Sequence, residues 1–422
     1  MLAFLCIVLS YVLKSFHNML EVSLFRSRAV ICLSTASLHH IIRAMTNDNP
    51  MLLSQPRTAR QINRYRVLNA LWHSSSFSKA SLAKALDLNK VSTGEIVEGL
   101  KAEGLVRDQG FLESSNGRPA ARLELIKDAR YIVTIHLGSR MISASIANLA
   151  AETLRFERQA KPAVKKPEEY VGFILRLGAK LLSACPEAKV LGVIITANAA
   201  FNEDCTSIID PVLGELPLVE GVRRILKVPS VLMPSSKALI RAEREILSKD
   251  FPSSTVAYLD WSDAISCALV IDGKIAALDS SIGHLKVEDT GLCTCGSIGC
   301  LQAQVSSWAL TGKADGQLSS VFEAGISDKA LCSMAKAMAV INCVTGARHL
   351  IIGGQGASID KAALTRLQAF VDSQRIKGSV PMELMASRLK DKAQETAAAN
   401  AGLDELLFKT SLIQDLGFND IV

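Results

Sequence analysis

The chain has 422 residues, of which 49% are hydrophobic and only 5% aromatic, and its formal net charge is +6. This length exceeds one ordinary domain and provides enough apolar residues for two or three cores, which excludes a single small module. Few aromatic residues favour helices packed on sheets over an aromatic-rich all-β protein. Seven of the ten cysteines are scattered singly in apolar surroundings, as buried free thiols are, so we expect a reducing, cytoplasmic location.

The first fifty residues differ from the rest. MLAFLCIVLSYVL is apolar for about a dozen residues, which is too short to span a bilayer, and it lacks the basic flank of a secretory signal. We therefore expect neither a signal peptide nor a membrane anchor. Residues 1–50 are interpreted as an upstream extension from an over-early start codon and receive no function.

Three short helices are predicted between residues 60 and 104. In RQINRYRVLNALW, the apolar residues Val67, Leu68, Leu71 and Trp72 recur on one helical stripe. A second helix follows the N-cap candidate Ser78 and buries its leucines. The third begins near residue 91, directs Ile96, Val97 and Leu100 to the core, and ends at Gly104.

The stretch LVRDQGFLESSNGRPAARLEL then predicts two strands around a polar loop, which completes a winged helix-turn-helix. Three amphipathic helices alone are more often a plain bundle. Residues 57–122, however, carry eleven Arg or Lys against six acids, an excess of five in a protein of net +6, which favours a polyanionic partner. The residues predicted to contact DNA are Lys90, Ser92 and Thr93 in the groove, with Arg60, Arg64 and Arg118 on phosphate or in the minor groove.

From residue 131 the pattern becomes α/β. YIVTIHLGSRMISASIANL predicts a β-hairpin, VLGVIITANAAF contains a buried strand, and VAYLDWSDAISCALVIDGKIAAL predicts two strands about a turn at Asp272 and Gly273. VGFILRLGAKLLSA and SKALIRAEREILS have helical spacing, and HLIIGGQGAS reads as strand, glycine turn and helix. Two strand-rich halves predict two similar lobes.

Three cysteines cluster in CTCGSIGC, residues 293–300, shortly after a Gly-His pair. Three thiolates and one imidazole would complete a tetrahedral shell with no open position for a substrate, so a metal bound there would brace the loop. Zinc suits these ligands, although spacing alone also admits iron, and three reduced thiols in a turn are the alternative.

The winged helix, the pair Gly283–His284, the segment CTCGSIGCLQ and the later IIGG together resemble the ROK family, over about residues 60–415. The family's name covers repressors, open reading frames and sugar kinases. The resemblance implies a two-lobed actin-like, ribonuclease H-like α/β fold and one structural Zn²⁺ held by His284, Cys293, Cys295 and Cys300. The loop between His284 and Cys293 is one residue shorter than is usual in the family.

The domains expected on this basis occupy the whole chain. They are an unassigned extension at 1–50, a winged helix-turn-helix at 51–126, a first lobe at 130–250, a second lobe with the zinc loop at 251–384, and C-terminal helices at 385–422 that pack on the first lobe.

The resemblance also allows a residue-by-residue test for kinase activity. Sugar kinases of the family carry D-x-G-G-T, where this chain has His136–Arg140, and a second loop G-T-G-x-G, where it has Asp260–Ala264. Their catalytic base is the Asp of N-D-x-N, and Ser235 stands at that position. Serine cannot act as a base at neutral pH, so we expect no enzyme activity. The glycines 353, 354 and 356 match a nucleotide-side loop but are equally a generic strand-to-helix connection, which we prefer.

The expected effector site is also altered. The family binds sugars through an Asn-Asp pair, two glutamates and the histidine, and here Ser281 and Gln302 replace the glutamates. His284 and Gln302 remain as candidate ligand contacts, although His284 is better explained as a zinc ligand. Loss of both carboxylates removes strong acceptors for sugar hydroxyls, which disfavours the usual sugar as the ligand of this chain.

The sequence therefore predicts a DNA-binding regulator similar to the N-acetylglucosamine- and glucose-type repressors of the family. We expect it to repress carbohydrate genes as a homodimer or tetramer on palindromic double-stranded DNA, with a sugar or sugar phosphate as the candidate effector and no membrane partner. The alternatives are an ATP-dependent sugar kinase and a family remnant that binds DNA without an effector.

Overall fold

The computed structural model describes residues 56–74, 77–111, 120–185, 189–251, 254–271, 274–276, 282–375, 377–389 and 393–409. Several sequence predictions lie outside these ranges: the extension at 1–50, the loop that carries Arg118, the turn at Asp272 and Gly273, and Ser281.

The N-terminal segment of this part contains three helices, α4 (Pro56–His73), α5 (Lys79–Ala85) and α6 (Lys90–Ala102). The predicted apolar stripe of α4 is buried, with Val67, Leu68 and Leu71 each at most 3% exposed. Ser78 caps α5 through a reciprocal capping box with Ser81. The side chain of Asn89 caps α6 by accepting a hydrogen bond from the Val91 amide.

A two-stranded antiparallel ribbon follows, made of β1 (Val106–Phe111) and β2 (Ala121–Leu125). Gly104 has φ of +68° directly after α6, which is the left-handed conformation that ends a helix at low cost. Leu123 is fully buried, and its amide donates to the Phe77 carbonyl, so the ribbon packs on the helices.

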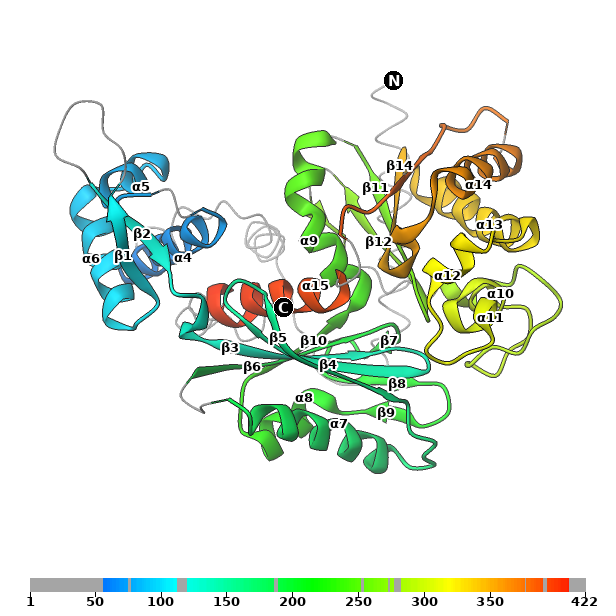
Figure 1. Ribbon diagram of the computed structural model, residues 1–422, viewed down its shortest axis with the longest axis horizontal. Helices are drawn as coiled ribbons and strands as arrows, with labels where there is room; N and C mark the ends of the chain where they lie inside the picture. Colours follow the sequence, from blue (N-terminus) through cyan, green and yellow to red (C-terminus); the bar gives the residue numbers. More distant parts are fainter. Residues whose placement is uncertain are drawn as a thin grey trace, which may run out of the picture. The chain divides into compact units, whose positions relative to one another are not determined.

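The first large sheet has five strands in the order β10-β6-β3-β4-β5. Their bounds are β3 (Tyr131–Leu137), β4 (Met141–Asn148), β5 (Thr153–Ala160), β6 (Val190–Ala197) and β10 (Ser230–Pro234). The hairpin of β3 and β4 confirms the prediction for that segment. Helix α7 (Pro167–Leu182) covers one face of the sheet and α15 (Ala393–Leu403) the other (Figure 1). Such coverage explains why the central strands are apolar on both faces.

Between β6 and β10 the chain forms a small antiparallel sheet of β7 (Ala200–Phe201), β8 (Ile208–Asp210) and β9 (Gly214–Leu216). It continues into the short helix α8 (Leu218–Gly221) and one further turn, η3 (Val222–Leu226). These three strands were not predicted from the sequence, because two or three residues are too few to show the alternation of apolar and polar residues that marks a strand.

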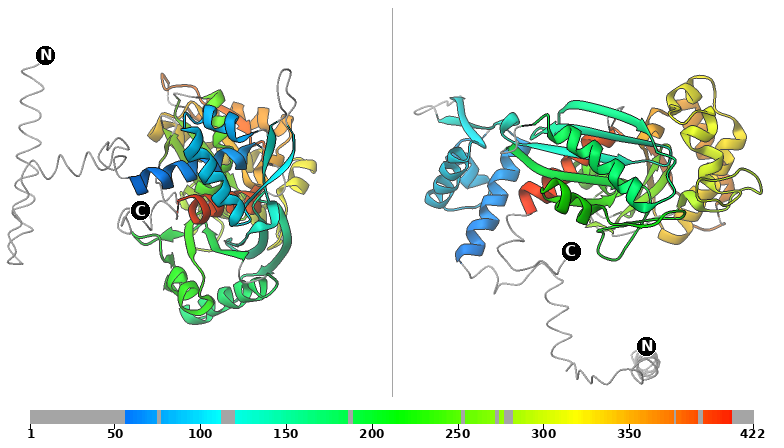
Figure 2. Two further views of the ribbon diagram at one scale, coloured as in Figure 1. Left: turned by 90° about the vertical axis from the view of Figure 1, so that its left-hand side faces the viewer. Right: turned by 90° about the horizontal axis from the view of Figure 1, so that it is seen from below.

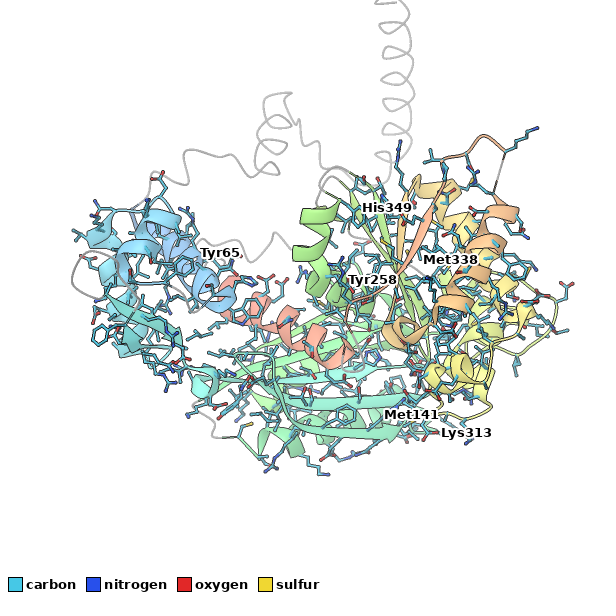
Figure 3. The ribbon with its side chains drawn as sticks, turned by 45° about the horizontal axis from the view of Figure 1, so that its top comes forward. Tyr65, Met141, Tyr258, Lys313, Met338 and His349 are labelled. Atoms are coloured by element: carbon cyan, nitrogen blue, oxygen red, sulfur yellow. The ribbon has the colours of Figure 1, made fainter. Side chains whose placement is uncertain are left out.

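The second large sheet has the order β13-β12-β11-β14-β15. Its strands are β11 (Val256–Trp261), β12 (Ile265–Ile271), β13 (Lys274–Ile275), β14 (His349–Gly353) and β15 (Glu383–Ala386). β11 and β12 meet through a tight turn at residues 262–264, which the sequence analysis had not separated from the strands. Tyr258 and Trp261 of β11 are fully buried, and Tyr258 is labelled within this sheet in Figure 3.

Helices surround the second sheet. They are α9 (Ser235–Asp250), α10 (Leu301–Val305), α11 (Ser307–Thr311), α12 (Leu318–Glu323), α13 (Asp328–Thr345) and α14 (Lys361–Gln374), with the single turns η4 (Ile282–His284) and η5 (Gly354–Ser358). α13 and α14 lie side by side, as the views of Figure 2 show. Met338 of α13 is fully buried in the core that these helices form with the sheet.

The C-terminal part corrects one prediction. Residues from Met385 were expected to be helical, but Met385 belongs to β15, which pairs in parallel with β14. Helix α15 and the π-helical turn η6 (Asp404–Lys409) come later. α15 packs on β3 of the first sheet, where a Cβ atom on Gly402 would lie 2.3 Å from Ile132. Only a glycine allows the helix to approach this closely.

Candidate ligand and metal sites

His284, Cys293, Cys295 and Cys300 converge, with one ligand atom of each within 4.8 Å of the others. His284 closes the turn η4, and the three cysteines lie on the loop that leads to α10. Two isolated antiparallel bridges, Lys286 with Cys300 and Leu292 with Ile298, fold this loop back on itself. Gly299 allows the fold, because its φ is +80° and a Cβ atom there would lie 1.7 Å from the Glu288 carbonyl.

The spacing of these ligand atoms suits a tetrahedral ion. The Sγ atoms of Cys295 and Cys300 are 3.8 Å apart, and Cys293 Sγ lies 3.6 Å from His284 Nδ1. Zn–S bonds of about 2.3 Å in a tetrahedron place two sulfurs ~3.8 Å apart. Burial, followed by the neighbouring thiols, raises the pKa of Cys300 to about 12. Three sulfur donors and one imidazole at this spacing fit a thiophilic divalent ion, which would displace the thiol protons.

A cavity of about 470 Å³, here called the central cavity, adjoins this cluster. His284, Thr294, Cys295 and Gln302 line it on one side. The opposite side is formed by the ends of β3 and β6 and by residues 208–213 of β8 and the turn after it. Both residues predicted as ligand contacts, His284 and Gln302, therefore line one cavity.

Gln302 is only 3% exposed, and both ends of its side-chain amide are already bonded. Its Oε1 accepts from the Ile265 amide at 3.3 Å, and its Nε2 donates to Thr294 Oγ1 at 3.0 Å. Asn198 is in a similar state, because its Oδ1 accepts from Ser266 Oγ and its Nδ2 donates to Asp260. The two side-chain amides that line the central cavity, those of Gln302 and Asn198, are therefore bonded to other groups of the protein.

A second cleft of about 570 Å³ lies on the other side of the β3–β4 turn. Its lining residues from the first sheet include His136, Met141 and Arg158, and Met141, at the start of β4, is labelled in Figure 3. Asp263 and the start of η5, at Gly354 and Gln355, also line the cleft. The cleft therefore joins the segments that correspond to the phosphate loops of a sugar kinase.

His136 and Ser235, which the family resemblance aligns with the first acid and the catalytic base of sugar kinases, lie within hydrogen-bond distance of each other. His136 Nδ1 is 3.2 Å from Ser235 Oγ, 3.2 Å from Thr196 Oγ1 and 3.0 Å from Gln394 Nε2. Burial lowers the pKa of His136, while the charge of Asp263 acts in the opposite direction. An imidazole carries no negative charge in either protonation state, so His136 cannot replace a carboxylate that holds magnesium.

Two aspartates, Asp260 at the end of β11 and Asp263 in the turn between β11 and β12, each approach one glycine loop. A Cβ atom on Gly138 would lie 2.3 Å from Asp263 Oδ2, and one on Gly354 would lie 2.1 Å from Asp260 Oδ1. Ser262 donates to Asp260 at 2.6 Å, and burial raises the pKa of Asp260 to about 6. Carboxylates therefore lie against the backbone that would have to approach phosphate groups.

The same turn connects the two large sheets. Ser139 Oγ donates to the Asp263 carbonyl at 2.7 Å, and Trp308 Nε1 donates to that carbonyl at 2.8 Å. The Arg140 guanidinium lies 4.3 Å from the centre of the Trp308 ring, which is a cation–π contact. The contact role of Trp308 was not predicted from the sequence, because a tryptophan in a short helix has the pattern of an ordinary core residue.

The predicted DNA contacts lie on α4 and α6, and one of them requires correction. Lys90 and Ser92 are exposed at the start of α6. Thr93 is fully buried and donates its hydroxyl to the Asn89 carbonyl, so it cannot reach a base. Helical periodicity places Thr93 on the same face as Ile96, Val97 and Leu100. The prediction of a groove contact rested on the polar hydroxyl of threonine and did not use this periodicity.

The arginines of α4 are partly occupied. Arg60 is exposed and 3.8 Å from Glu95, whereas Arg64 makes a 2.7 Å ion pair with Glu103. Val91, which the sequence analysis had not considered as a contact, is 71% exposed between Lys90 and Ser92. An apolar side chain at this position could meet a thymine methyl group.

None of the helices described in the structure combines the length and the apolar character that crossing a membrane requires.

Comparisons with known proteins agree with this architecture. Residues 132–371 match the ROK family, which is more than half of the chain. The xylose repressor of Caldicellulosiruptor bescii is 26% identical over 262 residues, a stretch that covers 60% of this chain and 65% of that repressor, just under two thirds of its length.

Two solved structures share the fold. A ROK family transcriptional regulator, described as a homologue of the E. coli Mlc protein, superposes with a TM-score of 0.62 at 16% identity, covering 85% of this chain and all of that one. A ROK family glucokinase from Streptomyces griseus, in complex with glucose and AMPPNP, superposes with a TM-score of 0.53 at 18% identity, covering 64% and 98%. The α/β architecture, the convergent His–Cys cluster and the matched residues together establish that this chain belongs to the ROK family.

Proposed function

We propose that this protein is a DNA-binding transcriptional regulator, in the first instance a repressor of genes for carbohydrate uptake or metabolism. The observation that carries the proposal is the exposed start of α6, where Lys90, Val91 and Ser92 project from a three-helix segment joined to a ROK domain. Similarity to the xylose repressor of C. bescii supports the regulatory role and the link to carbohydrate.

The N-terminal segment is proposed to be a winged helix-turn-helix at residues 51–126, with α6 as its recognition helix. Asn89 caps α6, so the positive end of the helix dipole and three exposed side chains point away from the core together. Arg60 and Arg118 remain proposed phosphate or minor-groove contacts. Arg64 is retained with a smaller expected effect, because Glu103 already neutralises it.

The remaining domains follow the sheets. The first lobe comprises residues 130–250, and the second lobe begins at 251 and extends through β15 to Ala386, beyond the boundary first expected. The C-terminal segment then packs α15 on the first lobe. A homodimer would present two recognition helices to a palindromic operator, with half-sites one or more helical turns apart.

Structural zinc is the metal proposed for His284, Cys293, Cys295 and Cys300. Four protein ligands leave no open coordination position, so the ion would hold the loop against the central cavity and take no part in a reaction. The fit of the sulfur separations to tetrahedral geometry supports this choice.

Loss of kinase activity is part of the proposal. Phosphoryl transfer needs a base at the sugar hydroxyl and neutralisation of the phosphate charge by magnesium. Ser235 and the neutral His136 provide neither, and Asp260 and Asp263 place negative charge beside both glycine loops. Likeness to the S. griseus glucokinase concerns the fold and supports no activity here.

The experiment that tests the regulator is genome-wide capture of DNA by the full chain, followed by sequencing of the bound fragments. We expect a palindrome near carbohydrate genes, with enrichment reduced at least tenfold by Lys90→Ala or Arg118→Ala. Lys329→Ala, an exposed lysine at the start of α13, is the matched control and should leave enrichment unchanged. Enrichment without sequence preference would reject the proposal.

The competing enzyme is tested separately. A sugar kinase would convert ATP and a hexose to ADP and a hexose phosphate, and this turnover would not depend on Lys90 or Arg118. We expect no ADP formation above a protein-free control with glucose, xylose or N-acetylmannosamine. An effector-independent remnant would instead bind the operator with an affinity that no small molecule changes.

A further inference from the structure

The central cavity combines a polar wall with few free hydrogen-bonding groups and an apolar flap, and this combination restricts its ligand. On the polar wall, Gln302 and Asn198 use both ends of their amides within the protein. Thr294 Oγ1 accepts from Gln302, and Ser266 Oγ has donated to Asn198. A ligand hydroxyl that displaces no existing bond therefore finds few partners on this wall.

The donors left in the cavity are few: His284, and the hydroxyls of Thr294 and Tyr170. The Nδ1 atom of His284 faces the thiol cluster, at 3.6 Å from Cys293 Sγ, and the residue also lines the cavity. If Nδ1 holds the proposed metal, Nε2 must carry the proton of the neutral ring and can donate one hydrogen bond to a ligand. These few donors do not satisfy the four or five hydroxyls of a free monosaccharide, and burying an unpaired hydroxyl is unfavourable.

The β8–β9 turn, on the opposite side of the cavity, is held in place. In this turn, Asp210 Oδ1 accepts from the amides of Val212 and Leu213 at 2.9 and 3.0 Å. Asp210 Oδ2 forms a 3.0 Å ion pair with Lys161, which ties the turn to the end of β5. Asp210 and Lys161 therefore neutralise each other's charge.

This turn presents its apolar side chains to the cavity. Val212 is 78% exposed and Ile209 39% exposed, and both line the cavity with Val164 and Pro211. Exposed aliphatic side chains beside a cavity gain contact and lose water when an apolar group covers them. We call residues 209–213 the apolar flap.

We propose that the effector of this protein is a monosaccharide that carries an apolar group, an alkyl or aryl glycoside, and not a free sugar or a sugar phosphate. The sugar ring would lie at His284 with part of its hydroxyls in water, and the apolar group would lie under the flap. A phosphate has no free cation in the described wall, because Lys161 is paired with Asp210. The inference rests on the proposed function, since it names the ligand class to which the regulator responds.

Titration calorimetry on the full-length, zinc-loaded protein tests this directly. The probes are D-glucose and D-xylose, their phenyl β-glycosides, glucose 6-phosphate, and phenol alone. We expect at least one phenyl glycoside to bind at least tenfold more tightly than its parent sugar and than phenol. The inference is overturned if the parent sugar or the sugar phosphate binds as tightly, if phenol alone equals the glycoside, or if no probe binds.

A matched pair of variants locates the site. Val212→Ser removes an apolar side chain from the flap, and Val344→Ser removes one of the same 78% exposure from α13, away from the cavity. We expect Val212→Ser to weaken the phenyl glycoside at least threefold and to leave the parent sugar within twofold, whereas Val344→Ser should change neither. Equal effects of the two variants would contradict the assignment of the flap.

The same samples separate this inference from the proposed function. If the protein binds its operator but no glycoside binds or weakens that complex, the ligand class is wrong and the regulator stands. If a glycoside binds under the flap but no operator is found, the cavity assignment stands and the regulatory role is wrong.

Discussion

At the scale of single residues, the proposed loss of kinase activity rests on several residues that act together. Ser235 cannot take a proton, and His136, within hydrogen-bond distance of it, is buried and neutral. Asp260 and Asp263 then place carboxylates where two glycine loops would meet phosphate. Restoring any one of these residues would leave the others to oppose phosphoryl transfer.

Asp260 should make stability depend on pH. Its pKa is about 6 in the folded state against 3.8 for an ordinary aspartate, because the carboxyl is buried beside Asp263. The folded state therefore holds this proton more tightly, and the resulting stabilisation is lost as the pH rises through 6. His136 acts oppositely in the same range, since its lowered pKa favours the folded state as the pH rises.

The comparison with Asp260→Asn isolates the aspartate. We expect the free energy of unfolding of the variant, relative to the natural chain, to increase between pH 4.5 and 7.5 by up to about 2 kcal/mol, since each pKa unit corresponds to about 1.4 kcal/mol and this range begins about 1.5 pH units below the folded-state pKa. Urea unfolding, followed by tryptophan fluorescence at the two pH values, measures this difference in the free energy of unfolding. Asp315→Asn, at an exposed site, should show no such trend, and a flat difference for Asp260→Asn would contradict the assignment.

Removal of one thiol should release the metal. We expect Cys293→Ser or Cys300→Ser to reduce zinc from one equivalent to below about 0.2, because three ligands bind it far more weakly than four. Cys343→Ser, at an exposed cysteine outside the cluster, is the control and should retain the full equivalent. Elemental analysis after gel filtration gives the number. Full zinc in Cys300→Ser would exclude this ligand set.

Gln302 can be altered to test the saturated wall. In Gln302→Glu the carboxylate can still accept from the Ile265 amide, while the other oxygen no longer donates to Thr294 and becomes an acceptor. We expect the affinity for free glucose or xylose to rise at least threefold, as measured by calorimetry. Unchanged affinity would mean that hydrogen-bond acceptors do not limit sugar binding.

At the scale of elements, the caps and turns determine which side chains α6 presents. Asn89 accepts from the Val91 amide at 2.8 Å and so begins the helix with Lys90, Val91 and Ser92 outward and Thr93 inward. α4 is joined to the first lobe by a 2.6 Å hydrogen bond from Trp72 Nε1 to the Leu149 carbonyl. A change in the first lobe therefore has a direct contact through which it can reach the helical segment.

The cap of α6 gives a prediction at this scale. Asn89→Ala removes the side-chain acceptor, which costs about 1 kcal/mol at a helix N-terminus, whereas Asn89→Asp keeps it. We expect amide hydrogen exchange in the first turn of α6 to become about fivefold faster in the alanine variant and to stay within twofold in the aspartate variant. Equal exchange in both would show that the cap does not stabilise this turn.

At the scale of the whole molecule, the local excess of positive charge predicts how DNA binding responds to salt. Each phosphate neutralised by Lys or Arg releases counterions, so the logarithm of affinity falls linearly with the logarithm of salt concentration. We expect the slope for the operator to decrease by about one for Lys90→Ala or Arg118→Ala and by less for Arg64→Ala, whose charge Glu103 already balances. Fluorescence anisotropy between 50 and 300 mM salt measures these slopes, and identical slopes in all variants would contradict the proposed contacts.

The sequence by itself determined the elements whose signals are local. Helical spacing identified the core stripe of α4, the hairpin of β3 and β4 followed from alternation, and the Gly-His and Cys-x-Cys spacing selected the four residues that converge. These predictions held because periodicity, caps and glycine turns act over a few residues. The family followed from the same motifs, since residues 132–371 match it.

Only the tertiary structure decided which of these residues can act. Thr93 was predicted to contact a groove, but packing buries it. Met385 belongs to β15 because β14 pairs with it, and Asp263 lies against Gly138 although 125 residues separate the two in sequence. The saturation of Gln302 depends on partners from β12 and from the cysteine loop. Free hydrogen-bonding capacity and burial are properties of neighbours in space, and a single sequence does not specify those neighbours.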